Sequence, residues 1–94
     1  MADAKTLSGT AREWVSKGAL LLDVRTPDEY RQGHLEGAVN IPVQELPRRL
    51  PEVGEPTRPV VVYCAAGMRA QSATELLRRA GFAQVLCLGG MSAW

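Results

Sequence analysis

The sequence predicts an α/β domain in which helices cover both faces of a parallel sheet of four to five strands, a three-layer sandwich. Three short runs are mainly apolar, at residues 20–24, 60–63 and 84–88, and a weaker fourth spans residues 38–41. Segments with helix signals lie between these runs. Strands that are apolar on both faces and alternate with helices are typical of a parallel sheet buried between helical layers.

The first two helices are expected to begin at capping boxes and to end at glycines. Residues 10–13 (TARE) fit a capping box, so a helix is expected to begin at Thr10 and to stop before Gly18. Residues 26–29 (TPDE) have the same pattern, with proline at the first helical position and acidic groups near the positive end of the helix dipole. Gly33 should end this second helix after about two turns.

The third and fourth helices differ in length. A short third helix is expected after Pro42, because Pro47 would remove a backbone donor from a longer one. The proline-rich residues 51–59 that follow are expected to form a surface loop. The fourth helix should span residues 69–80, with one apolar stripe at helical spacing: Ala73, Leu76, Leu77 and Ala80.

Length and composition exclude several classes of protein. The chain has 94 residues, so one domain over residues 1–94 is expected. Eleven basic and ten acidic residues give a net charge of +1, which leaves no extended cationic face for nucleic acid. The apolar runs are far shorter than the roughly 18 residues of a membrane span, and the start MADAKTLSG lacks the apolar region of a secretory signal. With two cysteines, we expect a cytoplasmic protein with reduced thiols and with neither membrane nor nucleic acid as a partner.

A candidate site follows the apolar run 60–63, where Cys64-Ala65-Ala66-Gly67-Met68-Arg69 leads into the fourth helix. In such sheets ligands bind outside the carboxyl ends of the strands. A strand–loop–helix turn directs successive backbone N–H groups and the positive end of a helix dipole at one point, which favours an anion. Gly67 is expected to supply a positive φ for the turn. Cys64 is therefore predicted to be a nucleophile at the sheet edge, kept as a thiolate by the loop without a histidine base.

The loop is predicted to act through its backbone and one cation. The side chains of Ala65, Ala66 and Met68 are uncharged, so the N–H groups of residues 65–69 would form most of the anion cradle. A cation at a helix start opposes the helix dipole. Because placing Arg69 there costs free energy, we expect its guanidinium to face the bound anion and not to lie in solvent.

Five stretches of sequence together resemble a single-domain rhodanese-like protein of the thiosulfate sulfurtransferase family. They are residues 22–25 (LDVR), 28–30 (DEY), 33–42 (GHLEGAVNIP), 63–70 (YCAAGMRA) and 88–94 (LGGMSAW). The resemblance covers nearly the whole chain and implies a five-stranded parallel sheet. It also implies that Cys64 takes the outer sulfur of a donor such as thiosulfate as a persulfide, and that an acceptor, cyanide or a thiol, then removes it. The resemblance implies no metal and no organic cofactor for this transfer.

Loop length favours sulfur over phosphorus chemistry. Related phosphatase and arsenate-reducing loops place one more residue between cysteine and arginine, whereas four residues separate Cys64 from Arg69 here, which suits a single sulfane sulfur. Two alternatives to an enzyme stay open. One is an inactive rhodanese-like interaction or regulatory module, a class that typically lacks the loop cysteine. The other is a carrier that receives persulfide from a partner such as a sulfur-relay protein.

The other conspicuous residues are expected to be structural. Asp23 and Arg25 should pair with each other or with backbone groups, and His34 should be a hydrogen-bonded residue rather than a base. Cys87 is predicted to pack in the core, with a relay thiol as the alternative. The remaining expectations are core or rim packing for Trp14, Tyr30, Phe82 and Trp94, and solvent-exposed faces for Arg48, Arg49, Arg78 and Arg79.

Overall fold

The computed structural model describes residues 4–94, with side chains from residue 7 onward. The first half contains helix α1 (Ala4–Ser16), strand β1 (Leu20–Asp23), helix α2 (Pro27–Gln32), strand β2 (Val39–Asn40), the 3₁₀ turn η1 (Leu46–Arg48) and helix α3 (Leu50–Val53). The second half contains strand β3 (Val60–Cys64), helix α4 (Met68–Arg79), strand β4 (Val85–Gly90) and the 3₁₀ turn η2 (Met91–Ala93). No helix within this described part of the chain is long and apolar enough to cross a membrane.

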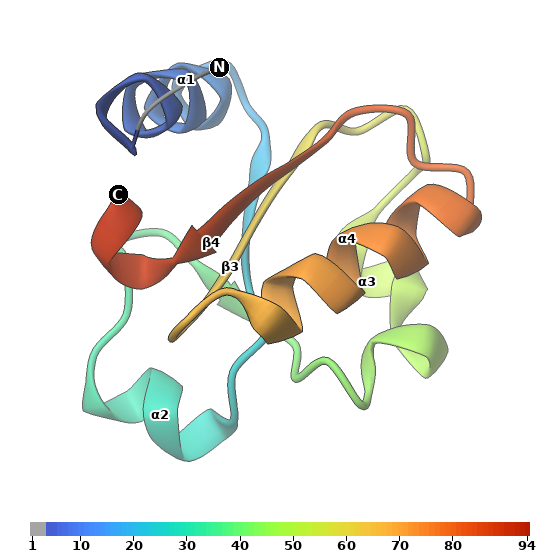
Figure 1. Ribbon diagram of the computed structural model, residues 1–94. Coiled ribbons are helices and arrows are strands. Elements are labelled where there is room, and N and C mark those ends of the chain that lie inside the picture. The colour runs from blue at the N-terminus through green and yellow to red at the C-terminus, as the bar shows by residue number, and fades with distance from the viewer. Residues whose placement is uncertain (1–3) are drawn as a thin grey trace.

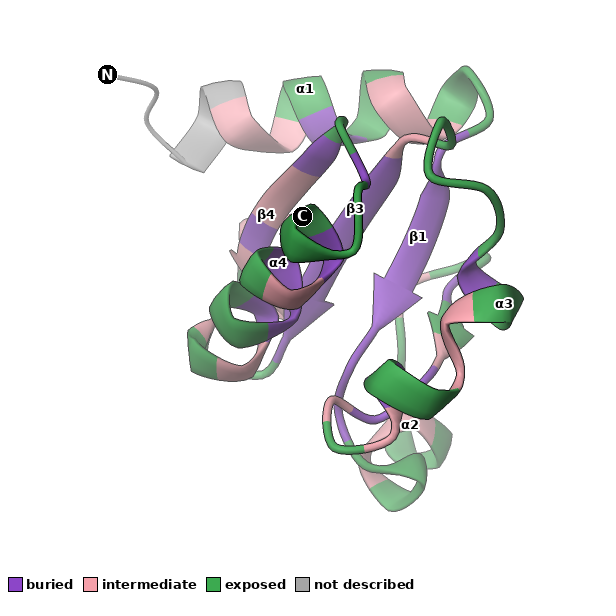
Figure 2. Ribbon diagram, turned by 90° about the vertical axis from the view of Figure 1, so that its right-hand side faces the viewer, coloured by how far each residue is buried: buried purple, intermediate pink, exposed green. Residues whose placement is uncertain are grey.

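In residues 4–94, four strands form one parallel sheet in the order β2-β1-β3-β4. Helix α1 and turn η2 cover one face, and α3 and α4 cover the other (Figure 1). The predicted three-layer α/β fold is therefore confirmed, with four strands where the resemblance implied five. Because all strands run the same way, their carboxyl ends share one edge, and α2 lies beside that edge (Figure 2).

Each face of the sheet has its own apolar core, and β3 contributes to both. Every residue of β3 is buried (purple in Figure 2), which is the pattern of a central strand covered on both sides. Val60, Val62 and Cys64 pack in the core beneath α4, together with Ala70, Ala73 and Leu77. Val61 and Tyr63 pack in the core beneath α1, together with Ala11, Leu21 and Leu88. The alternation of β3 therefore turns the Cys64 side chain toward α4.

Helix α1 starts earlier than predicted but ends where predicted. Helix α1 begins at Ala4, so the capping box predicted at Thr10 is wrong and Thr10 lies inside the helix. The physical reason is an apolar stripe that extends toward the N-terminus, because Leu7 packs in the same core cluster as Ala11 and Trp14, at helical spacing. The predicted end is confirmed, since α1 stops at Ser16 and Gly18 follows with a φ of +103°.

In place of the predicted short helix after Pro42, the chain forms the 3₁₀ turn η1, which contains Pro47, and α3 follows it. Pro47 and Pro51 each occupy the first turn of one of these short elements, where proline loses no intrahelical hydrogen bond. The surface loop predicted for residues 51–59 is consequently wrong for its first part, because α3 extends to Val53 and buries that side chain. Helix α4 begins at Met68, one residue before the predicted start.

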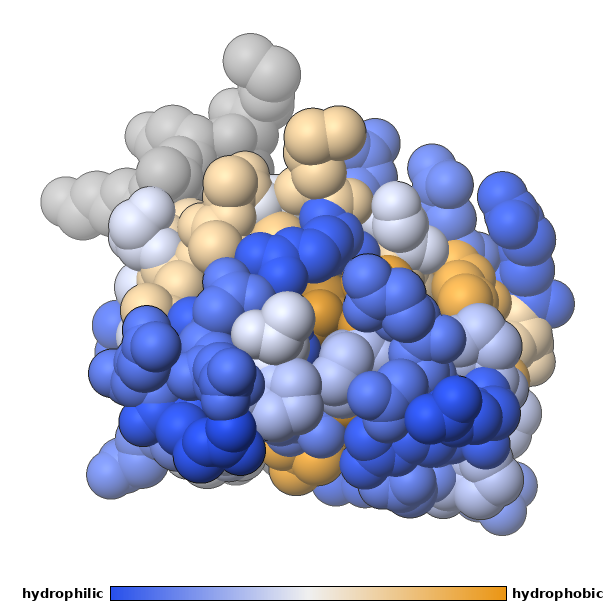
Figure 3. Space-filling model, turned by 90° about the horizontal axis from the view of Figure 1, so that it is seen from below, coloured by the Kyte–Doolittle hydropathy of each residue, from blue (hydrophilic) through white to orange (hydrophobic). Residues whose placement is uncertain are grey.

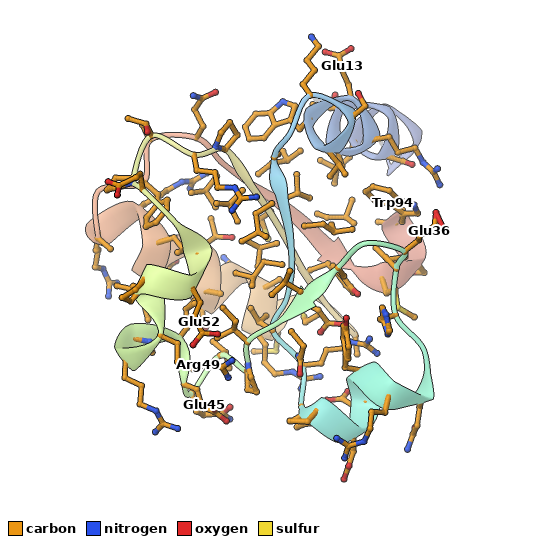
Figure 4. All side chains as sticks on the ribbon, turned by 180° about the vertical axis from the view of Figure 1, so that it is seen from behind. Glu13, Glu36, Glu45, Arg49, Glu52 and Trp94 are labelled. Carbon is orange, nitrogen blue, oxygen red and sulfur yellow. The ribbon has the colours of Figure 1, made fainter. Side chains whose placement is uncertain are left out.

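The remaining structural expectations are largely confirmed. Phe82 is buried, and the other three aromatic side chains are half-buried against the α1-side core: Trp14, Tyr30 and Trp94. Three of the four arginines lie in solvent as predicted: Arg48, Arg78 and Arg79. Arg49 departs from the prediction because it is half-buried between Glu45 and Glu52, with a 2.8 Å contact from Nε to Glu52 Oε2 (Figure 4).

Candidate active site

Cys64 ends β3 at the carboxyl edge of the sheet, and its sulfur lies beneath the loop that follows. The residue is only 1% exposed. Its Sγ accepts the backbone N–H of Gly67 at 2.9 Å and that of Ala70 at 3.3 Å. Cys64 thus lies at the predicted edge of the sheet, and the loop encloses its sulfur. Gly67 belongs to the predicted cradle of residues 65–69, whereas Ala70 is a donor that the sequence did not indicate.

Gly67 makes this enclosure possible. It is the N-cap of α4 with a φ of +111°, in the left-handed region, as predicted. The turn sets the N-terminus of the twelve-residue helix α4 against the sulfur. In the described chain, the N–H groups of Ala65, Ala66, Met68 and Arg69 bond to no protein acceptor, as is usual for the first turn of a helix. These groups remain available for an anion beside the sulfur.

The loop rests on two glycines of β4. Cys64 pairs with Gly90 in the sheet, after an irregularity in the register between Val62 and Tyr63. A Cβ atom built on Gly90 would lie 2.9 Å from the carbonyl oxygen of Ala65, closer than real Cβ contacts. A Cβ atom on Gly67 would lie 3.7 Å from the Cα of Gly89. The backbone of β4 therefore supports the loop at close range, which a side chain at Gly90 would prevent.

We expect Gly90→Ala to lower the rate of the sulfur transfer that the resemblance implies by about tenfold to a hundredfold, because the new methyl group pushes the Ala65 carbonyl and displaces the loop amides from the sulfur. Steady-state kinetics with thiosulfate and cyanide measure this loss. Gly9→Ala is the control, since Gly9 lies in α1 and a methyl group there would meet no atom within 4 Å. Equal rates for the parent and Gly90→Ala would contradict the supporting role of β4.

Arg69 forms a forked ion pair with Glu29. Its Nη1 lies 2.7 Å from Oε1 and its Nη2 lies 3.1 Å from Oε2, and the two side chains are 34% and 33% exposed. Glu29 also accepts the N–H of Thr26 at 3.0 Å and so completes the predicted capping box of α2. The Arg69 guanidinium and the Thr26 bond lower the pKa of Glu29 to about 2, and Glu29 raises the pKa of Arg69.

This ion pair is a feature that sequence reasoning missed. The sequence indicates Glu29 as the last residue of a capping box and as part of the stretch 28–30, and its partner is 40 residues away in the chain. The pair joins the first turn of α2 to the first turn of α4, so it links α2 to the helix that begins at the loop. The anion-facing role predicted for Arg69 stays a prediction, since a carboxylate already neutralises its charge.

We expect the stability contributed by this pair to depend on pH in the acid range. Glu29 titrates at about 2 when folded and at 4.5 ordinarily, so the contribution is complete above about pH 4.5 and is lost as pH falls toward about 2. Glu29→Gln keeps the capping box but not the charge. Its Tm should lie below that of the parent at neutral pH, and the difference should vanish near about pH 2. The control is Glu75→Gln, which removes an exposed contact of 3.8 Å; a Tm difference that is constant with pH would contradict the assignment.

Asp23, Arg25 and Tyr63 form a buried polar cluster at the ends of β1 and β3. Asp23 is 0% exposed and Arg25 is 6% exposed, and Nη2 of the arginine lies 2.7 Å from Oδ2 of the aspartate. The Tyr63 hydroxyl donates to the same Oδ2 at 2.7 Å and accepts the N–H of Leu35 at 3.1 Å. The predicted pairing is confirmed. Burial raises the pKa of Tyr63 to about 12, and the bond to Asp23 raises the pKa of Arg25.

Arg25 also bonds to the chain that follows α2. Its Nη2 donates to the carbonyl oxygen of Gly33 at 2.7 Å. His34 is exposed, with Nδ1 2.8 Å from the Tyr30 carbonyl oxygen and its ring stacked on the Tyr30 ring at 3.7 Å. The structural role predicted for His34 is therefore confirmed, and the segment beside the site is fixed by the buried cluster.

Cys87 lines a cavity that borders the loop but does not include Cys64. It is half-buried and packs against the α4-side core, as predicted. The cavity is open, has a volume of about 540 Å³ and lies between α4 and β4, where the loop residues 66–68 border it. The alternative of a relay thiol stays open.

Figure 3 views the molecule from the side on which α2 lies, and hydrophilic side chains cover most of that face.

Comparisons with known proteins identify a family. A family model described as "Rhodanese-like domain" matches residues 8–94. A sulfurtransferase from Allochromatium vinosum is 37% identical over 93 residues, which span 98% of this chain and 84% of that protein. The thiosulfate sulfurtransferase PspE from Escherichia coli is 39% identical over 71 residues, 74% of this chain and 68% of that protein. A solved structure described as a rhodanese with anions from E. coli matches with a TM-score of 0.77 and 36% identity, covering 82% of this chain and 92% of that one.

Proposed function

Because the chain belongs to the rhodanese-like domain family, a family of sulfurtransferases, we propose that it moves a sulfane sulfur from a donor such as thiosulfate to cyanide or a thiol through a persulfide on Cys64. The observation that carries this proposal is the position of Sγ, which accepts the N–H groups of Gly67 and Ala70 at the N-terminus of α4. Both donors and the helix dipole favour a negatively charged sulfur. A thiolate is the nucleophilic form of cysteine.

The first half of the reaction charges the enzyme with sulfur. The Cys64 thiolate attacks the outer sulfur of thiosulfate, the S–S bond breaks, and sulfite leaves with the bonding electron pair. Cys64 then carries an S–S⁻ group. Its inner sulfur keeps the bonds from Gly67 and Ala70, and the N–H groups of Ala65, Ala66, Met68 and Arg69 are proposed to hold the outer sulfur.

The second half restores the thiolate. Cyanide, or the thiolate of an acceptor, attacks the outer sulfur, and the Cys64 sulfur leaves with the electron pair of the S–S bond. The products are thiocyanate, or a new persulfide, and the free Cys64 thiolate that the loop amides stabilise as a leaving group. The four residues between Cys64 and Arg69 favour a single sulfane sulfur over a tetrahedral oxyanion as the bound group.

The alternatives to an enzyme make different use of the loop. An inactive module has no need of the cysteine that this chain retains, whereas a persulfide carrier would use the same Cys64 and differ only in its donor.

We propose one catalytic domain that works in a reducing compartment, the cytoplasm, because the reaction requires Cys64 as a free thiol.

Mass spectrometry of the intact protein tests the proposal. After incubation with thiosulfate or polysulfide, the protein should gain the mass of one sulfur atom, peptide mapping should place it on Cys64, and cyanide should remove it as thiocyanate. Absence of sulfur on Cys64 with both donors would refute the proposed function. Sulfur on Cys87 alone would refute the assignment of the nucleophile.

A further inference from the structure

The cations around the mouth of the site are already balanced by carboxylates. Arg69 bonds to Glu29 through both of its terminal nitrogens. Arg25 bonds in the same forked way to the buried Asp23, and Arg31 on α2 pairs with Asp28. Arg78 has no carboxylate partner among the described residues, but it donates to the carbonyl of Val85 at the opposite, amino end of β4. The side chains therefore place no net positive charge at the loop.

The rim of the loop is uncharged as well. Ala65 and Ala66 are exposed, Gly67 has no side chain, and Met68 is 82% exposed. The positive potential that reaches the sulfur comes from backbone amides and from the N-terminus of α4. Beyond Met68, the cavity of about 540 Å³ continues along α4 past Gln71 and Thr74. Its lining includes Glu75 and Arg78, one charge of each sign, so space for the bulk of a donor lies outside the loop without a net positive charge.

These charges discriminate between classes of donor. Thiosulfate brings two negative charges to a thiolate, so three negative charges meet where only amide dipoles oppose them. A persulfide presents the same sulfane sulfur with one negative charge when ionised and with none when protonated as R–S–SH, so it brings less charge than thiosulfate. Its R group would lie against the uncharged rim of Ala65, Ala66 and Met68 instead of placing a sulfonate there.

Resting on the proposed function, we infer that the neutral rim and the Glu29–Arg69 pair select a thiol-borne persulfide, R–S–SH, over thiosulfate as the sulfur donor. The Cys64 thiolate attacks the outer sulfur, the S–S bond of the donor breaks, and R–S⁻ leaves with the electron pair. Cys64 then carries –S–SH, the donor becomes a thiolate, and no oxidant or reductant is consumed. The R group is a small thiol or a cysteine side chain of a protein, since the two share this chemistry.

Donor kinetics with a charge-adding variant and its uncharged match test the inference. Met68→Lys adds one cation at an exposed position on the rim, and Met68→Gln is the uncharged match of similar length. The donors are thiosulfate, cysteine persulfide and a persulfidated peptide with a single cysteine. Each kcat/KM is divided by the rate constant of the same donor with free cysteine, which removes differences in intrinsic reactivity.

The parent should favour both persulfides over thiosulfate by about tenfold or more after this division. Met68→Lys should raise the value for thiosulfate by about tenfold, an effect that added salt weakens, and Met68→Gln should keep the parent ratio between donors. Glu29→Gln, which uncovers the charge of Arg69, should act in the same direction as Met68→Lys. Activity with only one of the persulfides supports the inference and identifies whether R is small or a peptide.

Two results would overturn the inference. One is a parent protein that uses thiosulfate as well as the persulfides after normalisation. The other is a Met68→Lys variant whose thiosulfate value is unchanged or whose values for all donors rise equally. Failure of every donor to sulfurate Cys64 is a different result, because it refutes the proposed function itself.

Discussion

Cys64→Ser is expected to abolish sulfur transfer, with thiocyanate formation from thiosulfate or a persulfide falling by at least about a thousandfold. The variant removes the atom that forms the covalent intermediate, and a serine hydroxyl is a far weaker nucleophile toward sulfur. It retains an acceptor for the N–H groups of Gly67 and Ala70, so the loop should keep its shape. Transfer assays together with thermal melts separate loss of chemistry from loss of fold.

Two further variants control this result. Cys64→Ala also abolishes transfer but leaves the two buried amides without an acceptor, so it should be less stable than Cys64→Ser by about 1–3 kcal/mol. Cys87→Ser should retain transfer, because the substitution leaves Cys64 and its bonds from Gly67 and Ala70 in place. Thiocyanate formation by Cys64→Ser at the parent rate would contradict the mechanism, and loss of activity in Cys87→Ser would favour the relay alternative.

Asp23→Ala is expected to lower the free energy of unfolding by about 3–5 kcal/mol, the largest stability effect in the domain. The substitution leaves Arg25 buried without its counterion, and it removes the acceptor of the Tyr63 hydroxyl. Arg25 then loses its link from β1 to the segment at Gly33. Urea denaturation of the parent and the variant measures the difference.

The size of that loss depends on the unpaired charge, which a second variant tests. The double variant Asp23→Leu with Arg25→Met removes both buried charges. It should therefore recover much of the stability that Asp23→Ala loses. Asp23→Asn serves where Asp23→Ala fails to fold. A loss below about 1 kcal/mol for Asp23→Ala, the usual size for an exposed pair, would show that the cluster does not hold the strands together.

The sequence predicted the central strands and the turn after Cys64 well because their signals are local. The run at residues 60–63 is apolar on both faces, and only the middle of a covered sheet accommodates such a strand. Cys64 and Gly67 lie in one short turn, so the direction of the Gly67 amide toward the sulfur follows from the turn itself. The pairing of Asp23 with Arg25 is similarly local, since the partners are two positions apart in sequence.

The features that the sequence did not predict depend on contacts between distant segments. The Glu29–Arg69 pair spans 40 residues, and only the packing of α2 beside α4 brings the two side chains together. The enclosure of Cys64 depends on the approach of Gly90 to the Ala65 carbonyl, which follows from the register between β3 and β4. At the start of α1, a capping pattern at Thr10 competed with the apolar stripe from Leu7, and burial of that stripe decided the boundary.

The proposed chemistry depends above all on one claim, that backbone amides hold the Cys64 sulfur in both its reduced and its sulfurated form. Amide proton chemical shifts measured by NMR report those hydrogen bonds directly. We predict that Cys64→Ala moves the amide proton signals of Gly67 and Ala70, and that loading the parent with one sulfur atom moves those of the rest of the cradle: Ala65, Ala66, Met68 and Arg69. Amide signals that stay in place through both changes would contradict the claim.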